Sequence, residues 1–447
     1  MAGIAGIAAK NAGEKVTEML DRIRHRGRAG ISVFEKEGTT LGLVWNESEE
    51  EIVKGFLAEG TVGDDNGPGH YARVRPEKGN FIMYRDELGV APLYYGRDNA
   101  GNICFSSEVK ALLLISGEIN EMPPGQYFDG TMLKSFFRLE AGTPSEEKPE
   151  QIAVRLRNHL DDAVSDCIRS ETVGSWLSGG LDSSTICALA ASHVKQLKTF
   201  VAGMKGAPDL EYASETAGFI KSDHHEIIVS TDDMIRVLPE VIYHLESFDA
   251  LLVRSSITNY LVGKLASDHV SEVFSGEGGD ELFAGYEYLK SIPLMHLEDE
   301  LVKITGSLHN TALQRVDRSA SAHGTRAHIV FTNPDVVKFA FTIPVKYKIF
   351  NNVEKWILRK AMERLLPDSI LKRPKAKFWE GAGVKELISD HASKQITDRD
   401  FRLERKLSNG LIINTKEELY YYRIFKDHFG SDIDLSWMGR TKGSPVA

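Results

Sequence analysis

Two glycine-rich segments carry the side chains best placed to do chemistry in this sequence. The first, Ser178-Gly-Gly-Leu-Asp182-Ser-Ser184, follows a short apolar run and precedes an apolar helical pattern. Its glycines let the backbone curl around an anion, its Ser and Asp side chains cap the helix, and free N–H groups face the ligand. The pattern lacks the lysine of the Walker motif GxxxxGK[ST]. We predict an anion-binding turn at the start of a helix.

The second segment is Ser275-Gly-Glu277-Gly-Gly-Asp280-Glu281. Acidic residues between glycines contribute little to stability, because carboxylates repel one another and glycine loses much conformational entropy on folding. Magnesium bound to nucleotide phosphates, by contrast, needs carboxylates of this kind. The segment therefore indicates a site for a magnesium-bound nucleotide.

Both segments resemble signatures of known enzymes. SGGLDSS resembles the PP-loop of the ATP pyrophosphatases, which cleave ATP to AMP and pyrophosphate, and SGEGGDE resembles the SGEGxDE signature of the asparagine synthetases. This resemblance implies ATP and Mg²⁺ as cofactors, with Asp182 and Asp280 holding the metal and Glu277 accepting a proton beside the amine nucleophile. It also implies a set of ATP- and pyrophosphate-binding residues, namely Leu177, Ser178, Gly179, Gly180, Asp182, Ser183, Ser184, Val201 and Gly276.

Further blocks extend the resemblance over about residues 150–425. Val201 lies in a segment that resembles the family's adenosine-side strand. Arg254 and Ser255 match a block implied to bind substrate, and an arginine suits a carboxylate bidentately. Lys375, in Arg373-Pro-Lys375, lies where the family places a lysine near the α-phosphate, and a fixed cation there would lower the barrier to acyl transfer. Its neighbours Lys372 and Lys377 are competing candidates.

The N-terminal region resembles a glutaminase that has lost its active site. The start resembles M-C-G-I-x-G-I, but Ala2 replaces the cysteine that serves that family as nucleophile. The glutamine-gripping NGE and S-D-T-E blocks are absent, whereas Tyr84–Tyr95 and Ser106–Leu113 match blocks that face the synthetase domain in relatives. We therefore expect free ammonia or another amine as the nitrogen source. An engineered alanine in a working glutaminase is the alternative.

The resemblance implies an ATP-dependent amide-forming ligase. In the main hypothesis, aspartate attacks the α-phosphate of Mg-ATP, and ammonia then displaces AMP from the acyl-adenylate to give asparagine. One alternative is a specialised amide ligase or cyclase, similar to β-lactam synthetase, that acts on another acid or amine. Retention of Glu277 favours intermolecular amide formation, whereas Arg326 and His328 replace an acid and an arginine of the family's E-x-R-V-P-F-L-D segment. A second alternative is a non-catalytic nucleotide-binding homologue.

The elements that must position these residues fall into two regions, separated by a polar, proline-punctuated stretch at residues 140–150. Before it, short β-like runs dominate. After it, strands at 173–177 and 198–203 alternate with helices at 184–194 and 212–222, which indicates a parallel sheet. We predict a two-domain α/β and α+β protein. Residues 1–145 form a degenerate, class II glutamine amidotransferase-like (Ntn-hydrolase-like) sandwich. Residues 146–447 form a PP-loop, adenine nucleotide alpha hydrolase-like synthetase domain.

Composition limits the partners and the compartment. The chain has 447 residues with 42% hydrophobic and 26% charged residues, and its net charge of −10 disfavours a nucleic-acid substrate. No window approaches the roughly 18 consecutive apolar residues of a membrane span. The cysteines Cys104, Cys167 and Cys187 lie far apart without CxxC spacing, as expected for a reducing cytoplasm. The expected partners are a carboxylic amino acid, ammonia or another amine, and a second copy in a homodimer.

Overall fold

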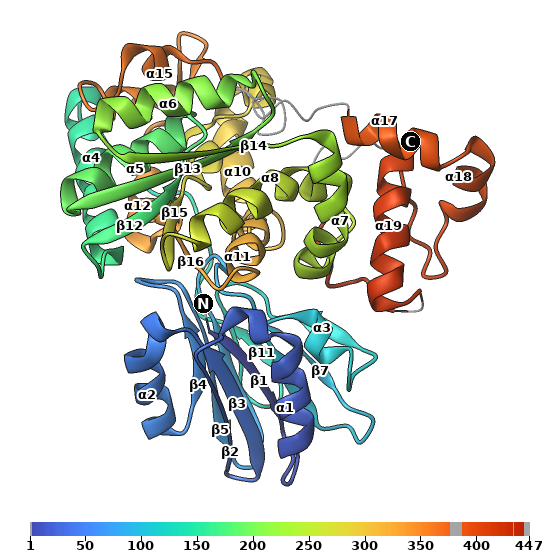
Figure 1. Ribbon diagram of the computed structural model, residues 1–447. Coiled ribbons are helices and arrows are strands. Elements are labelled where there is room, and N and C mark those ends of the chain that lie inside the picture. The colour runs from blue at the N-terminus through green and yellow to red at the C-terminus, as the bar shows by residue number, and fades with distance from the viewer. Residues whose placement is uncertain (1, 376–386, 432, 442–447) are drawn as a thin grey trace.

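The computed structural model describes residues 2–375, 387–431 and 433–441, and its first region consists of two antiparallel sheets (Figure 1). The six-stranded sheet has the order β2-β3-β1-β8-β7-β9, with bounds Gly30–Lys36, Thr39–Trp45, Gly3–Ile7, Ile103–Ser106, Tyr94–Arg97 and Ile119–Glu121. The five-stranded sheet has the order β11-β10-β6-β5-β4, with bounds Leu133–Ser135, Gln126–Phe128, Asn80–Arg85, Tyr71–Glu77 and Val62–Asp65.

Alternating side chains explain how these sheets pack. In β3, Leu41 and Leu43 point into a buried cluster that also contains Phe81 and Phe105 from β6 and β8. Period-two patterning of this kind is what a sheet needs to bury one face. Figure 1 shows α1 (Gly13–Arg22) and α2 (Glu50–Glu59) on opposite sides of the strands. The short α3 (Val109–Leu112) follows β8.

The second region is built on a five-stranded parallel sheet of order β14-β13-β12-β15-β16. Its strands are Asp223–Ile228, Gln196–Gly203, Thr172–Trp176, Glu272–Ser275 and Arg326–Ile329. The strand order reverses between β12 and β15, and ligands bind at such a switch point beyond the carboxyl ends of the strands. The surrounding helices are α4 (Pro149–Cys167), α5 (Leu181–His193), α6 (Pro208–Ile220), α7 (Thr231–Leu245) and α8 (Ala250–Ser267).

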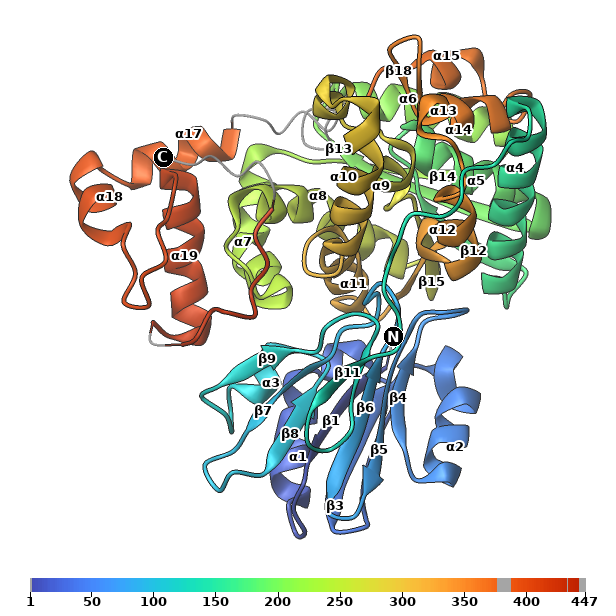
Figure 2. The same cartoon turned by 180° about the vertical axis from the view of Figure 1, so that it is seen from behind.

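The rest of the chain is mostly helical, as the sequence indicates. It comprises α9 (Gly279–Phe283), α10 (Leu294–Gly306), α11 (Ala312–Ser321), α12 (Pro334–Ala340), α13 (Val345–Lys348), the hairpin β17–β18 (Ile349–Phe350 and Val353–Glu354), α14 (Trp356–Ala361), α15 (Asp368–Lys372), α17 (Leu387–Gln395), α18 (Asp398–Glu404) and α19 (Lys416–Phe429). Both overall views show α11 where the two regions meet (Figures 1 and 2). Among the helices of the described residues, none is long and apolar enough to cross a bilayer.

The predicted fold class is confirmed, and the differences are local. Helix α5 begins at Leu181 rather than Ser184, so the glycine turn leads directly into it. Helix α2 was not predicted, although Val53 and Leu57, four residues apart, pack on the buried cluster between the sheets. In the structure the backbone N–H of Asn46 donates to Glu49 Oε2 at 2.9 Å, which stabilises the helical start just before α2. Strand β16 was also missed, since Arg326 and His328 obscure its apolar character.

Candidate active site

The turn between β12 and α5 forms one wall of a cavity. Ser178 Oγ lies 3.1 Å from Ser183 Oγ, and Ser183 Oγ donates to the Gly180 carbonyl at 3.2 Å. Gly179 has a φ of +66°, and a Cβ there would lie 2.5 Å from the backbone N of Ala213, so only glycine fits. Leu177, Ser178, Gly180, Asp182 and Ser183 line the cavity, whereas Gly179 and the buried Ser184 support the turn from behind.

The second wall is the segment after β15, and it brings Asp280 next to Asp182. Lys355 contacts both carboxylates, and Lys375 Nζ lies 2.5 Å from Asp280 Oδ2. Although burial disfavours the charged ammonium, Asp280 and Asp182 raise the pKa of Lys375. Burial raises the pKa of Asp182 despite Lys355, whereas at Asp280 the two lysines outweigh burial and lower the pKa. The four side chains form a charge-balanced cluster of two carboxylates and two ammonium groups.

Sequence reasoning missed Lys355, although its block, Glu354-Lys-Trp-Ile-Leu-Arg359, resembles a family block. Lys355 has a φ of +53°, a left-handed conformation that is uncommon for a side-chain-bearing residue. Such strain persists where the surroundings hold it, often at functional sites. Arg373, also missed, donates from Nη1 to the Ser178 carbonyl at 3.2 Å and contacts Asp209, so it ties the glycine turn to α6.

Glu277 lies at the cavity wall and contacts Arg315 of α11. Its side chain is 26% exposed, so a small molecule in the cavity can reach it. Nearby, Tyr286 donates to Glu281, and burial followed by the charge of Asp280 raises the pKa of Glu281 to about 7. Carboxylates with such different environments next to one another are typical of acid–base sites.

Another part of the cavity wall combines apolar side chains with small polar ones. Its residues come from β13 and α8 and include Phe200, Val201, Ala202, Ser255, Thr258, Asn259 and Val262. The α8 residues recur at helical spacing, which places them on one face. Gly276 lets the segment after β15 pass close to the start of α5, because a Cβ there would lie 2.6 Å from the Ser183 backbone N. Apolar side chains of β13 in the same cavity as a phosphate-binding turn suit a nucleotide.

Comparison with known proteins identifies the family. The asparagine synthase family model matches residues 155–304 and 295–441, and the glutamine amidotransferase domain model matches residues 49–149. Asparagine synthetase [glutamine-hydrolyzing] 2 of Arabidopsis thaliana is 32% identical over 381 residues, which cover 78% of this chain and 65% of that protein. Asparagine synthetase B [glutamine-hydrolyzing] of Escherichia coli is 32% identical over 383 residues, covering 80% and 69%. The chain belongs to the asparagine synthetase family.

Two asparagine synthetase relatives are longer than this chain by a wide margin. The chain spans 65% of the Arabidopsis protein and 64% of the nodule enzyme of Pisum sativum, to which it is 33% identical over 380 residues covering 78% of this chain. Residues of both family signature segments line the cavity. The predicted residues that line it are Leu177, Ser178, Gly180, Asp182, Ser183, Val201, Ser255, Gly276, Glu277, Asp280 and Lys375.

Other residues singled out by the family resemblance lie elsewhere. Arg254 is one residue, or about 100° of helix rotation, from Ser255. It is not among the cavity-lining residues, and its guanidinium contacts Glu417 of α19, with Nε donating at 3.0 Å. Lys372 contacts Asp368 and is largely exposed, whereas Lys375 lines the cavity together with Lys355. Lys377 lies outside the described residues.

Arg326 and His328 also lie away from the cavity-lining residues. On β16, Arg326 Nη2 donates to Glu49 Oε1 at 3.0 Å, and His328 Nε2 lies 3.1 Å from Glu272 Oε2. Glu49 belongs to the N-terminal region, so Arg326 contributes to the contact between the regions. These two departures from the family segment therefore lie on β16, beside the contact between the regions, and not among the cavity-lining residues.

Ala2, the position of the family's nucleophilic cysteine, is buried in an ionic environment. Its N–H donates to Asp64 Oδ1 at 3.0 Å, and its carbonyl accepts from Arg26 Nε at 3.3 Å. Ala2 is 4% exposed, and both charged side chains are inaccessible to solvent. The alanine has no nucleophile, and Asp64 and Arg26 hold its backbone on both sides.

Proposed function

We propose that this chain is an AMP-forming, ATP-dependent ligase that adenylates a carboxylate, most directly that of aspartate, and converts it to an amide with ammonia. The observation that carries this proposal is the cavity at the β12–β15 switch point. It joins the PP-loop-like turn, the Asp182–Asp280 pair, Glu277 and Lys375 in one space. In this view residues 146–447 form the catalytic domain, and residues 1–145 form a domain that supplies no nitrogen.

The glycine turn and the apolar side chains of β13 together suit ATP. Backbone N–H groups at the start of α5, with Ser178 and Ser183, would hold the pyrophosphate end, since a helix N-terminus favours anions. Val201 and its apolar neighbours on β13 would hold the nucleoside end. The α-phosphate would then lie between these groups, near Lys375 and Glu277.

The acidic pair fits a magnesium ion. Asp182 Oδ1 is buried without a hydrogen-bond partner in the described structure, so it has an oxygen available for a ligand. A Cβ on Gly279 would lie 2.7 Å from the Asp182 carboxylate, so the glycine keeps space open there. Asp182 and Asp280 would hold Mg²⁺, which when bound neutralises phosphate charge. The lysines that contact these carboxylates would then turn toward the phosphates.

The proposed reaction has two steps. A substrate carboxylate oxygen attacks the α-phosphorus of ATP, which forms the acyl-adenylate and releases pyrophosphate. Ammonia then attacks the acyl carbon, a proton moves to the Glu277 carboxylate, and AMP leaves with the C–O bond electrons. Lys375, a fixed cation, would stabilise charge that develops on the phosphate. Holding the partners side by side would supply much of the acceleration.

Two observations support ammonia over glutamine. Ala2 offers no nucleophile, and its backbone N–H and carbonyl are both hydrogen-bonded to the buried Asp64 and Arg26. The Arabidopsis and E. coli relatives bear glutamine-hydrolysing names, so this preference would set the chain apart from them.

The test is pyrophosphate release from Mg-ATP with a panel of amino acids, each with ammonium or glutamine. We expect release and asparagine formation with aspartate and ammonium, and none with glutamine. Glu277→Gln should retain acid-dependent ATP–pyrophosphate exchange while amide formation falls by about 10²- to 10⁴-fold. Asp182→Asn should lose both steps.

Other outcomes assign the alternatives. Turnover of another acid in place of aspartate would indicate a specialised amide ligase or cyclase. If no acid gives pyrophosphate release although ATP binds, the chain is a non-catalytic nucleotide-binding homologue. Equal rates with glutamine and ammonium would overturn the proposed nitrogen source.

A further inference from the structure

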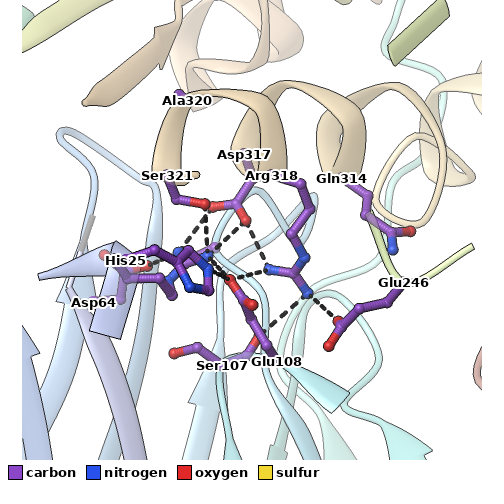
Figure 3. Close-up of polar contacts among 12 residues, drawn as sticks. His25, Asp64, Ser107, Glu108, Glu246, Gln314, Asp317, Arg318, Ala320 and Ser321 are labelled. Atoms are coloured by element: carbon purple, nitrogen blue, oxygen red, sulfur yellow. Dashed lines mark hydrogen bonds and ion pairs between the residues drawn. The ribbon is translucent and has the colours of Figure 1, made fainter. Parts of the chain in front are cut away.

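A buried ionic network connects the N-terminal region to helix α11 (Figure 3). Its members are almost inaccessible to solvent, namely Arg26, Asp64, Glu108, Lys110, Glu246, Asp317 and Arg318. Its carboxylates outnumber its cations, so the loss of any one cation would leave buried carboxylates with less compensating charge. Because buried charges are tolerated only when they are paired with good geometry, this network holds its elements in one arrangement.

Arg26 makes the most direct connection between the regions. Its Nη1 donates to Asp317 Oδ2 at 2.8 Å, and its Nη2 donates to Asp317 Oδ1 at 2.9 Å. This two-pronged pairing of a guanidinium with a carboxylate fixes orientation as well as distance. The same guanidinium donates to Glu108 Oε1 at 2.9 Å and Asp64 Oδ2 at 3.2 Å, which anchors it in the N-terminal sheets.

Further contacts hold the same face of α11. Arg318 Nη2 donates to Glu246 Oε2 at 3.1 Å, and Gln314 donates to the Leu245 carbonyl at 2.8 Å. Figure 3 shows Asp317, Arg318 and Ser321 projecting from α11 toward Glu108 and His25. This face of the helix is therefore held both by the end of α7 and by the N-terminal region.

Another face of α11 reaches the cavity. Arg315 precedes Asp317 by two residues, which is about 200° of helix rotation, so the two side chains leave the helix on opposite sides. Arg315 lines the cavity and contacts Glu277. A rotation or shift of α11 would therefore move Arg315 and with it the carboxylate of Glu277.

We propose that Arg26 is a positioning residue for the amide-forming step, acting through Asp317 and α11 on the Arg315–Glu277 pair. This role rests on the proposed function, because it takes Glu277 as the group that serves the amine. It gives the N-terminal region a task that needs no glutaminase chemistry. Loss of Arg26 would leave the Asp317, Glu108 and Asp64 carboxylates buried with less compensation and would release α11 from its anchor.

The test compares Arg26→Met and Arg26→Lys with Arg326→Met. The last variant is a matched control, because Arg326 also makes a buried contact between the regions, with Glu49, but from β16 and without contact to Glu277. ATP–pyrophosphate exchange without ammonium reports adenylation, and amide formation against ammonium concentration reports the second step. We expect Arg26→Met to lower kcat/KM for ammonium by about 10- to 100-fold, with exchange within about threefold of the parent.

The controls separate positioning from general stability. Arg26→Lys should recover part of kcat/KM for ammonium, and Arg326→Met should leave the ratio of the two steps unchanged. Asp317→Asn should add little to Arg26→Met, since coupled residues give non-additive effects. Equal losses in both steps for Arg26→Met, or an additive double variant, would overturn the proposed role.

If the parent enzyme is inactive with every acid, the proposed function is contradicted. The connection from Arg26 to α11 is then tested by a structural measurement. Hydrogen exchange of the amides of Ala312–Ser321 should then rise in Arg26→Met but not in Arg326→Met. Unchanged protection of α11 in Arg26→Met would overturn the inference even then.

Discussion

Replacing Gly276 with alanine is expected to remove most of the adenylating activity while the fold persists. Gly276 lies where the segment after β15 passes the start of α5, and a Cβ there would lie 2.6 Å from the Ser183 backbone N. Carbon contacts are optimal from about 3.5 Å and the Ser183 Cα would lie at 2.8 Å, so the two segments must separate by about 0.7 Å (3.5 − 2.8). Since a misplacement of about 1 Å at an active site costs about 100-fold in rate, we expect a loss of that order.

The assay is aspartate-dependent ATP–pyrophosphate exchange, with urea unfolding as the measure of stability. Gly276→Ala should lower the free energy of unfolding by about 1–3 kcal/mol, as overpacking of a core does. Gly218→Ala is the control, because nothing lies within 4 Å of the Cβ position at Gly218 in α6. That change should stabilise the protein by about 0.5–1 kcal/mol and leave exchange unchanged. Exchange by Gly276→Ala within about threefold of the parent would refute the reasoning.

Three further predictions each concern one residue. Arg254→Ala should lower the free energy of unfolding by about 1–3 kcal/mol because it deprives the buried Glu417 of its cation, and a changed KM for the acid would contradict this stabilising role. Ala2→Cys should not produce glutamate from glutamine, since the backbone of residue 2 is bonded to the buried Asp64 and Arg26 and the glutamine-gripping blocks are absent; measurable glutaminase activity would disprove this. Burial lowers the pKa of Lys348 to about 7. Below pH 7 the folded state therefore carries the full penalty of a buried charge. The free energy of unfolding should rise as the pH increases from 7 toward the unfolded-state pKa of about 10.4. Lys348→Met should flatten that slope in urea unfolding and stabilise the protein near pH 7, and an unchanged slope would contradict it.

The sequence by itself determined the chemistry-bearing segments and the fold class. The glycine turn and its acidic partner could be found because their geometry is local. A strand, a glycine with positive φ and a helix start need only neighbouring residues, as at Gly179 and Leu181. The alternation of strands and helices after residue 150 predicted the parallel sheet for the same reason.

The tertiary structure decided which of these residues share a site. Lys355 belongs with Asp182 and Asp280 because α14 packs beside α9, and Arg254 turns away from the cavity because one helical residue is about 100° of rotation. The pairing of Arg26 with Asp317 joins residues 291 positions apart in the chain. No local pattern encodes such a contact, since it arises only when the two sheets and α11 have packed and excluded water from the charges between them.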